Sequence, residues 1–410
     1  MAYFVDVTDT TAVASDVAQG KVFYAADGTP TVGTASGGGG DPAPVKSDVN
    51  FYDYDGTLLH SYTATETAGL TALPENPSHS GLVAQGWNYT LEEIKAEVTD
   101  HGKCNVGQMY VTTDGKTRIY CTFQEGRLSP YLGICPNGTV VVDWGDGSGT
   151  DTLTGTSLTV VKTVQHAYAS ARDYVITLTV SSGSFAFYGK SQGTCLLTKD
   201  EVPGNESMIY ANAVTRIEIG SSVSVSAYAF NSCNSLASIT IPSGVTSIGE
   251  YAFYGCYSLA HVTIPSGVTI IGQRVFYYCY TLASITIPSG VIIIGQRVFY
   301  NCYTLASITI PSGVTSIGEY AFYNCRSLAS ITIPSGVTSI GNNAFVNCFG
   351  MSEYHLKPVT PPTLGTSAFQ NIPSDCTIYV PYSQDHSILA AYRAATRWST
   401  YAAYMLEDAA

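Results

Sequence analysis

The most constraining feature of this sequence is a 23-residue unit that occurs five times in succession between Leu236 and Gly350. The copies align without gaps, so phenylalanine, glycine and proline return at fixed intervals: Phe253, Phe276, Phe299, Phe322 and Phe345; Gly249, Gly272, Gly295, Gly318 and Gly341; Pro242, Pro265, Pro288, Pro311 and Pro334. A unit of this size is too short to bury its own apolar face, so neighbouring units must stack and share one continuous core. A shorter copy precedes them at 214–235, and a degenerate copy follows around Tyr354, Leu356 and Phe369.

Each copy begins with Leu-x-x-Ile-x-Ile or a close variant, the pattern of leucine-rich-repeat coils. The longer pattern I-P-S-x-V-T-x-I-G-x-x-A-F-x-x-C resembles the BspA-like leucine-rich repeat over about 165 residues. The C-terminal end is similar to the usual terminus of that family, with a strand at 376–381 and a helix from about Ser387 that contains Ala390, Tyr392 and Trp398. Such proteins are mostly adhesins and surface-recognition molecules, so the resemblance implies binding rather than catalysis.

A second resemblance lies upstream of the repeats. The stretch VVDWGDGSGTD, followed by QHAYASARDYVITLTV, resembles a PKD-like β-sandwich. It departs from that family where Arg172 and Asp173 stand before Tyr174, a place where glycine is usual. The resemblance implies a spacer or a scaffold adjacent to carbohydrate.

Residues 48–117 predict a small α+β domain. Trp87 is its expected aromatic anchor. A helix opens at the capping box Thr90-Leu-Glu-Glu93, because the threonine and glutamate side chains can each satisfy a free backbone N–H of the first turn. The pair Asp114-Gly115 predicts a hairpin turn.

The first 36 residues, including DTTAVASDVAQGKVFYAADGTPTVGT, are similar to short modules of bacteriophage tail and baseplate proteins. That resemblance implies docking onto other virion tail proteins through the N-terminus. We therefore predict a mostly β chain of six segments: an attachment module at 1–36, a flexible Gly/Pro linker at 37–47, the small α+β domain at 48–117, the PKD-like β-sandwich at 118–200, the leucine-rich-repeat β-solenoid at 201–378 and a capping helix region at 379–410.

Composition excludes several classes of partner. Only 12% of the residues are charged, the formal net charge is -13, and no lysine occurs between Lys199 and Lys357. Affinity for nucleic acid depends on lysine and arginine at phosphates, so nucleic acid and anionic membranes are poor partners. No apolar run approaches the roughly 18 residues of a membrane span. The start of the chain lacks a basic segment before an apolar one, so we expect a removed signal or another route out of the cell, with the phage virion favoured over the bacterial cell surface.

One short motif matches an enzyme. The run Asp53-Tyr-Asp55-Gly-Thr57-Leu58 fits the D-x-D-G-T loop of haloacid-dehalogenase-type phosphotransferases, in which the first Asp is the nucleophile and the second the acid/base. That chemistry needs a doubly wound sheet with a lysine and further aspartates for Mg²⁺, and about 70 residues of mixed strand and turn cannot supply one. We therefore predict a β-hairpin with an Asp-Gly turn, no catalytic residue and no cofactor.

Neither the acidic loop nor the cysteines predict a metal centre. The spacing of Asp143, Asp146 and Asp151 departs from an EF-hand loop and favours a plain turn, with calcium left open. Side chains in a ladder point in parallel, so free buried thiols are predicted rather than disulfides at the six cysteines that follow the repeat: Cys233, Cys256, Cys279, Cys302, Cys325 and Cys348. His261 stands where later copies have serine, and we expect it to face solvent.

Differences between the copies mark the predicted binding surface. Core positions stay fixed, whereas the pair after each repeat glycine and the residues that flank each cysteine vary and are expected to face outward. Tyrosine supplies contact area at low entropic cost, and the partner expected is a bacterial surface glycan or protein, with a homo-oligomer left open. The candidate ligand-binding residues are Tyr251, Tyr254, Tyr257, Arg274, Tyr277, Tyr280, Arg297, Tyr300, Tyr303, Tyr320, Tyr323 and Arg326.

Two alternatives to this surface stay open. The tyrosine rings can serve only to brace adjacent coils. A second candidate surface is the strand face, where hydroxyl residues alternate with core isoleucines: Ser238, Thr240, Thr263, Thr286, Thr309 and Thr332. A flat hydroxyl array suits glycans, but it also suits water.

Overall fold

The computed structural model describes residues 22–24, 30–32, 48–190, 193–194 and 211–408. The chain divides into two units, Met1–Lys46 and Ser47–Ala410. In the first unit, β1 (Val22–Tyr24) pairs antiparallel with β2 (Pro30–Val32). The predicted attachment module and linker otherwise lie outside the described residues.

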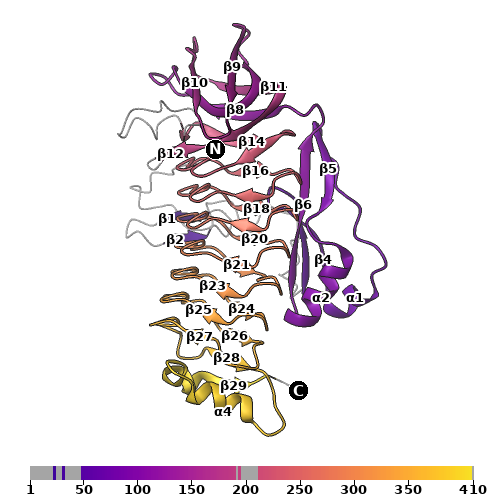
Figure 1. Cartoon of the computed structure of the whole chain (residues 1–410), viewed down its shortest axis with the longest axis vertical. Coiled ribbons are helices and arrows are strands. Elements are labelled where there is room, and N and C mark those ends of the chain that lie inside the picture. Colours follow the sequence, from indigo (N-terminus) through magenta and orange to yellow (C-terminus); the bar gives the residue numbers. More distant parts are fainter. Residues whose placement is uncertain (1–21, 25–29, 33–47, 191–192, 195–210, 409–410) are drawn as a thin grey trace, which may run out of the picture. The chain divides into compact units, whose positions relative to one another are not determined.

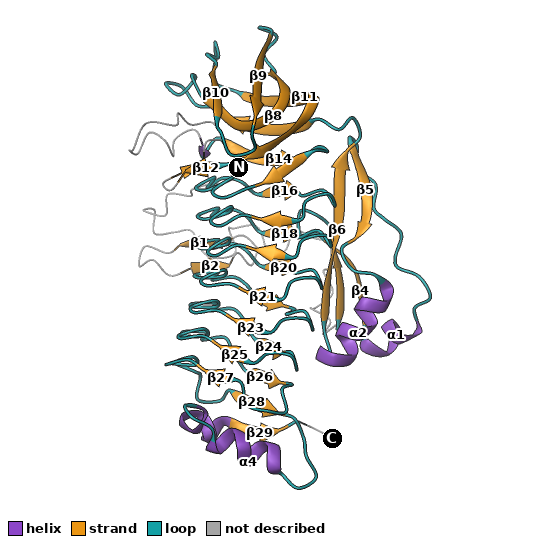
Figure 2. Cartoon of the chain, in the orientation of Figure 1, coloured by secondary structure: helices purple, strands orange, loops and turns teal. Residues whose placement is uncertain are grey.

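The C-terminal part of the second unit is a solenoid in which each repeat forms one coil (Figure 1). One side consists of eight short strands: β14 (Val214–Glu218), β16 (Ser238–Thr240), β18 (His261–Thr263), β20 (Ser284–Thr286), β22 (Ser307–Ile308), β24 (Ser330–Ile333), β26 (Glu353–Leu356) and β28 (Thr377–Val380). A second side consists of shorter strands: β15 (Val223–Val225), β17 (Ser247–Ile248), β19 (Ile270–Ile271), β21 (Ile293–Ile294), β23 (Ser316–Ile317), β25 (Ser339–Ile340) and β27 (Thr363–Leu364). Parallel pairing joins neighbouring strands of both rows in groups of two to four, such as β18-β20-β22 and β21-β23-β25-β27, and turns form the remaining side (Figure 2). The predicted mostly β solenoid is confirmed.

Stacked phenylalanines fill the interior of the solenoid. The rings of Phe276 and Phe299 lie 5.6 Å apart at an interplanar angle of 2°, and both side chains are fully buried. Beside this stack, the Cys302 Sγ donates to the Phe276 carbonyl oxygen at 3.2 Å, a contact that four other coils repeat. The ten described cysteines are buried free thiols, as predicted for the repeat ladder. Burial raises the pKa of Cys302 well above its ordinary value, so the thiol stays protonated.

The stretch before the repeats shares the core of the solenoid. It comprises β7 (Thr117–Thr122), β8 (Tyr131–Asp143), β9 (Thr150–Thr156), β10 (Lys162–Gln165), β11 (Asp173–Phe187), β12 (Gly189–Lys190) and β13 (Gly193–Thr194). Strand β7 pairs with β14, and β11 pairs with β15, so one apolar cluster of described residues includes both these strands and the coils, from Ile119 to Met405. These strands thus cover the first coil.

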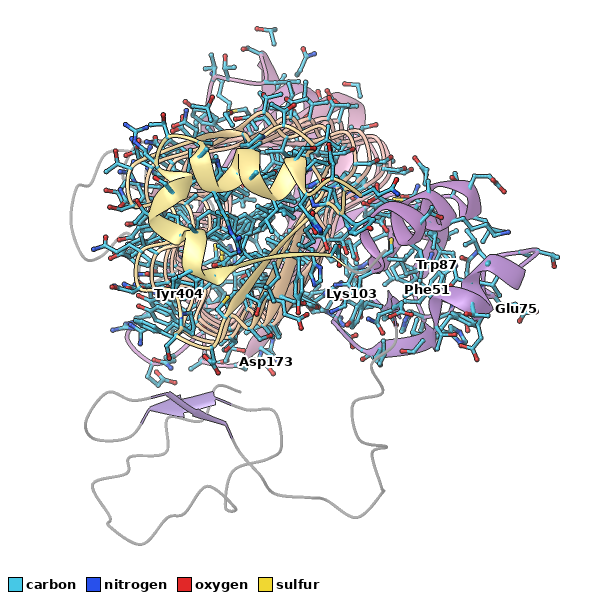
Figure 3. All side chains as sticks on the ribbon, turned by 90° about the horizontal axis from the view of Figure 1, so that it is seen from below. Phe51, Glu75, Trp87, Lys103, Asp173 and Tyr404 are labelled. Atoms are coloured by element: carbon cyan, nitrogen blue, oxygen red, sulfur yellow. The ribbon has the colours of Figure 1, made fainter. Side chains whose placement is uncertain are left out.

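A small unit, residues 48–112, has a core of its own. Its sheet has the order β4-β3-β6-β5, formed by β3 (Val49–Tyr52), β4 (Leu58–Tyr62), β5 (Leu82–Trp87) and β6 (Cys104–Thr112), with helices α1 (Ala64–Gly69) and α2 (Leu91–His101). Phe51 and Trp87 meet edge to face at 4.9 Å inside it (Figure 3). The predicted capping box of Thr90 and Glu93 is confirmed.

The turn at Asp114 and Gly115 does not form the predicted hairpin. Strand β6 pairs with β3 and β5, whereas β7 pairs with β11 and β14, so the turn connects two different sheets. The Asp114 carboxylate accepts the Lys116 N–H and pairs with Arg118 at 2.6 Å, which accounts for the acidic residue at this position.

The C-terminal segment closes the far end of the stack. Helix α4 (Ser387–Ala394) is followed by a short 3-10 helix, η2 (Trp398–Tyr404), and by β29 (Met405–Glu407), which pairs in parallel with β28. Trp398 Nε1 donates to the Pro362 carbonyl oxygen at 2.7 Å, so its indole lies in the core with its one donor satisfied. Among the described helices, none has the length and apolar character that crossing a bilayer requires.

Candidate functional site

One of the two candidate surfaces is covered by the small unit. Strand β6 runs alongside the row of strands that begins with β14 (Figure 1), and the hydroxyl residues of that row are largely buried beneath it: Thr240, Thr263, Thr286 and Thr309. Asn105 N–H donates to Thr309 Oγ1 at 3.2 Å, and Lys103 Nζ donates to Ser330 Oγ at 3.0 Å (Figure 3). The second candidate surface, left open above, is therefore closed to a ligand at these coils, because a part of the same chain occupies it.

The small unit follows the spacing of the coils. On α2, Glu93 and Glu97 stand four residues apart on one face of the helix. The Glu93 carboxylate accepts the Ser289 hydroxyl at 2.5 Å, and the Glu97 carboxylate accepts the N–H and hydroxyl of Ser312 at 3.1 Å. These serines occupy equivalent positions in consecutive repeats. One helical turn thus matches one step of the solenoid.

His261 belongs to this contact and does not face solvent as predicted. Its side chain is 1% exposed and forms hydrogen bonds with Ser284 Oγ at 2.8 Å and Thr263 Oγ1 at 3.3 Å. Burial lowers its pKa to about 4, so the ring is neutral at pH 7. Repeat periodicity contains no sign of the strand that covers it.

The tyrosines of the turn side form two files, each with one ring per coil. In the first, Tyr277 and Tyr300 stack at 4.4 Å with their planes 1° apart, and the file runs through Tyr254, Tyr277, Tyr300 and Tyr323. In the second, Tyr280 and Tyr303 stack at 5.0 Å, with Tyr257 before them and the Arg326 guanidinium 4.8 Å from the Tyr303 ring. All twelve predicted residues lie on this side: eight of them form these two files, and the other four lie at the corner of the coil before the first file.

Two arginines, flanked by two tyrosines, occupy the corner where four consecutive coils enter the turn side. The Arg274 guanidinium lies 5.2 Å from the Tyr251 ring, and that of Arg297 lies 4.7 Å from the Tyr320 ring. These four residues have φ between 55° and 58°, the left-handed region that bulky side chains rarely adopt. The backbone geometry of the coil, repeated at every step, holds them there.

Tyr278 is a member of this surface that the sequence analysis missed. Its ring lies 4.3 Å from Tyr277 and 5.6 Å from Tyr280, so it links the two files. Its φ is 65°, and the equivalent position, also with positive φ, is occupied by Gly255 in the previous copy and by Asn301 in the next. A tyrosine at a position that favours Gly and Asn is the signal that points to it. We call Tyr278 and the twelve predicted residues the tyrosine face.

Stacking determines what the tyrosine face can offer a ligand. Because the rings of each file lie face to face, their faces are occupied by one another, and ring edges and hydroxyl groups remain for contact. Burial raises the pKa of Tyr277 and Tyr300, so both phenols stay neutral and can donate as well as accept. Ring edges carry partial positive charge, which adds to that of the arginines. The arrangement suits acceptor-rich ligands.

The residues of the phosphotransferase motif form hydrogen bonds that stabilise a turn. The Asp53 carboxylate is buried, accepts the Tyr54 N–H at 2.8 Å and pairs with His79 Nε2 at 2.7 Å. Asp55 Oδ1 accepts the Thr57 N–H at 2.9 Å. Strands β3 and β4 flank this turn as the predicted hairpin. The four-stranded sheet of the small unit is not doubly wound.

The three aspartates of the acidic loop each have a different partner. Asp143 accepts the Gly145 N–H, Asp146 accepts Ser148 and contacts His166, and Asp151 accepts Trp144 Nε1 at 2.7 Å. The carboxylates therefore brace a turn around a buried tryptophan. Within the described part of the chain, no group of three His, Cys, Asp or Glu side chains is arranged to hold a metal ion.

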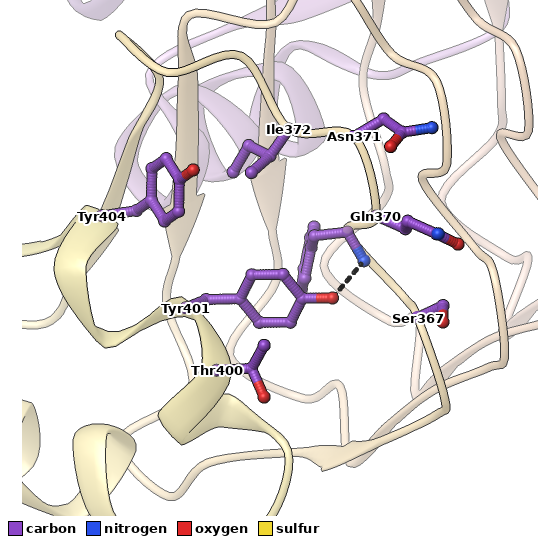
Figure 4. A pocket seen from close by; sticks show the side chains of 8 residues that line it. Ser367, Gln370, Asn371, Ile372, Thr400, Tyr401 and Tyr404 are labelled. Carbon is purple, nitrogen blue, oxygen red and sulfur yellow. Dashed lines mark hydrogen bonds between the residues drawn. The ribbon is translucent and has the colours of Figure 1, made fainter.

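A hollow of about 400 Å³ lies between the last coil and the C-terminal helices (Figure 4). It is lined by Ser367, Phe369, Gln370, Asn371, Ile372, Thr400, Tyr401 and Tyr404. The Tyr401 hydroxyl points across it to accept the Phe369 N–H at 3.3 Å. The lining contains neither a carboxylate nor a basic side chain, so it offers no acid–base pair for catalysis.

Comparison with known proteins identifies the repeats. Residues 202–315 and 292–388 match the family model described as "BspA type Leucine rich repeat region", in six copies. No curated protein matches the chain. Among solved structures, the T. pallidum leucine rich repeat protein (TpLRR) is 36% identical with a TM-score of 0.33, and covers 35% of this chain and 66% of its own.

Two further solved structures are similar. A leucine-rich repeat protein from Bacteroides ovatus is 26% identical with a TM-score of 0.34, over 40% of this chain and 48% of its own. A leucine rich cell surface protein from Faecalibacterium prausnitzii is 26% identical with a TM-score of 0.19, over 34% and 58%. This chain therefore spans less than two thirds of each of the three.

Proposed function

We propose that this chain, whose residues 202–388 match BspA-type leucine-rich repeats, is a non-enzymatic recognition protein that binds a surface ligand through its tyrosine face. The observation that carries the proposal is the pair of stacked tyrosine files on the side of the solenoid that the small unit leaves uncovered. Interfaces are enriched in tyrosine and arginine, and rigid stacked rings lose little entropy when a ligand binds. The ligand is a bacterial surface glycan or protein.

The small unit supports this assignment by elimination. It occupies the hydroxyl side: at one end Gln85 Oε1 accepts the Ser243 N–H at 2.8 Å, and at the other Lys103 Nζ donates to Ser330 Oγ at 3.0 Å. A ligand that approaches the same coils meets the turn side and the second strand row instead. The two tyrosine files run along that turn side over four coils.

Binding of the labelled full-length chain to a panel of intact bacterial cells tests the proposal. The tyrosine variant, Tyr254→Ala with Tyr277→Ala and Tyr300→Ala, is expected to lower cell binding at least tenfold while the thermal unfolding midpoint changes by a few degrees. Equal binding together with a large loss of thermal stability would show that the rings only brace the coils. A variant of the covered side, Thr286→Ser, is the matched control.

The cellular setting proposed first is the bacterial surface, because BspA-type repeats are a feature of surface proteins. The resemblance of residues 1–36 to phage tail modules favours a second candidate, a host-attachment protein of a virion that docks through its N-terminus. Antibody labelling separates the two. Signal on intact producing cells supports the surface protein, whereas signal only on purified phage particles supports the virion protein.

A further inference from the structure

Two adjacent coils in the middle of the solenoid differ from the other copies in sequence, and they differ at the same positions. Ile270 and Ile293 stand where the other full copies have serine, at Ser247, Ser316 and Ser339. In the same two copies, Gln-Arg at 273–274 and 296–297 replaces Glu-Tyr or Asn-Asn. Since the copies are otherwise nearly identical, the repeat fold does not require these residues.

The substituted isoleucines are exposed. Ile270 is 63% exposed, Ile293 is 51% exposed, and Ile292 beside it, where other copies have threonine, is 57% exposed. Ile270 and Ile293 lie on the outer face of β19 and β21, Ile292 directly precedes β21, and the neighbours of the two strands in the same row, Ser247 and Ser316, carry hydroxyls. Three aliphatic side chains that gain nothing from the core therefore form an apolar patch in an otherwise polar row.

This patch continues into the arginines and the first tyrosine file. Arg274 follows Ile270 by four residues, and its N–H donates to the Gln296 carbonyl oxygen at 3.0 Å, so the two Gln-Arg corners are neighbours. Tyr277 and Tyr300 follow directly in the same two coils. Between residues 217 and 350 the chain has three arginines and no lysine, and two of the three belong to these corners.

We propose that these two coils, residues 259–304, form a docking site for a protein whose surface combines aliphatic and carboxylate side chains. This inference rests on the proposed function and selects one of the two ligand classes that it leaves open. Aliphatic side chains complement an apolar protein surface, and guanidinium groups such as those of Arg274 and Arg297 recognise carboxylates through paired N–H donors. Arg274 Nη1 already donates to the Tyr251 hydroxyl at 2.7 Å and pairs with Glu250 at 3.5 Å, so a partner carboxylate competes with Glu250 for this arginine. A sugar ring gains most from an open aromatic face, and the files leave only edges and hydroxyls.

The flanking copies of the repeat show which substitutions the fold tolerates at these positions. The exchange variant combines Ile270→Ser, Ile293→Ser, Arg274→Tyr and Arg297→Tyr, which are the residues that the flanking copies carry at these positions. Tyr251 and Tyr320 have φ of 58° and 56°, against 55° for both arginines, so the backbone is unchanged. Thr315→Ser with Thr338→Ser, on the same row of neighbouring coils, is the matched control.

Selection of a displayed random-peptide library on the immobilised full-length chain tests the inference, with an oligosaccharide array in parallel. Peptides enriched in Asp or Glu together with Leu, Ile or Phe are expected, and their affinity for the exchange variant should fall at least tenfold while the control variant binds them normally. Peptides that bind the exchange variant equally well overturn the inference. So does oligosaccharide binding that the exchange abolishes, or self-association of the parent chain that the exchange abolishes in sedimentation.

The tyrosine variant distinguishes failure of the proposed docking site from failure of the proposed function. Loss of cell binding in the tyrosine variant but not in the exchange variant overturns the docking site and leaves the tyrosine face standing. Cell binding that survives in both overturns both.

Discussion

The imidazole of His261 packs against the ring of Tyr52, with ring centroids 5.4 Å apart and planes tilted by 35°. In the sequence these residues are separated by most of the small unit, by strands β7 to β13 and by the first coils, and their contact joins β3 to β18. The Cβ position of Gly56, at the tip of the neighbouring turn, would lie 2.8 Å from His261 Cβ, so the turn closes over the ring without space to spare.

The first prediction is an acid-dependent loss of stability at this contact. Burial lowers the pKa of His261 to about 4, and the charges of Asp55 and Asp53 oppose the shift. An unfolded histidine titrates near pH 6.5, so between about pH 6.5 and 4 the unfolded chain binds a proton that the folded chain does not. Stability is therefore fully present above that window and falls as the pH drops through it, by about 2 kcal/mol at pH 5.

Unfolding midpoints of the parent and of His261→Ser at pH 7 and pH 5 measure this effect. Serine is the residue of the equivalent position in three neighbouring copies, Ser238, Ser284 and Ser307, so the variant retains the fold. The parent is expected to lose more stability between the two pH values than the variant. An equal loss in both proteins would assign the acid sensitivity to the carboxylates elsewhere.

The second prediction concerns the close approach of β6 to the coils. A Cβ at Gly107 would lie 2.3 Å from Thr263 Oγ1 and 2.6 Å from its methyl carbon. Gly107→Ala should therefore destabilise docking by about 1–3 kcal/mol, the usual range for overpacking, and speed cleavage of residues 48–112 by a protease. Gly69→Ala, at the end of α1 with open space around it, is the control and should leave both unchanged. Equal proteolysis of the two variants would mean that the small unit is not held by this contact.

The third prediction separates stability from binding at Tyr278. Tyr278→Asn introduces the residue that the next copies carry, and the new amide is expected to pair with Asn301, as Asn324 already does at 2.7 Å. Relief of a left-handed tyrosine, about 1 kcal/mol, offsets the lost ring contacts. The free energy of unfolding, measured with denaturant, should therefore change little, whereas ligand binding should fall. A clear loss of stability with unchanged binding would make Tyr278 a brace.

The fourth prediction contrasts the core with the surface. Phe299 is fully buried between Phe276 and Phe322. Phe299→Ala should cost about 3–5 kcal/mol in the free energy of unfolding, because the shared core cannot close around the cavity. Tyr300→Ala, in the adjacent position, removes half-buried stacking and should cost about 1 kcal/mol. Chemical denaturation with a single midpoint for the parent provides the measurement, and equal losses for the two variants would contradict the division between core and tyrosine face.

Periodicity predicted what depends on neighbouring coils alone. Phe299 and Cys302 recur at each step because every coil must fill the same interior, and their burial follows from the repeat. The stacked files follow in the same way, since tyrosines 23 residues apart are neighbours in consecutive coils.

Features that depend on the small unit could not be predicted from the repeat. His261 occupies a position that is serine in neighbouring copies, and a residue that differs in a single copy resembles ordinary surface variation. Only the contact with Tyr52 and the cover of β6 explain its burial. Tyr278 was missed for a different reason: its neighbours in the repeat are Gly255 and Asn301, so it belongs to no file of tyrosines. The exposure of Ile270 could not be predicted either, because it depends on which residues of the second strand row face outward.

The match between the small unit and the coils bears on how this protein can change in evolution. Tandem copies with nearly the same sequence gain and lose members by unequal recombination. At the levels that the small unit contacts, every full copy presents the same threonine in its strand and the same serine after its proline, for example Thr286 and Ser289 or Thr309 and Ser312. A change in copy number therefore presents α2 and β6 with the hydroxyl partners they had before. Only the level of His261 is unique, so the array can lengthen or shorten beyond it while the docked arrangement is inherited intact.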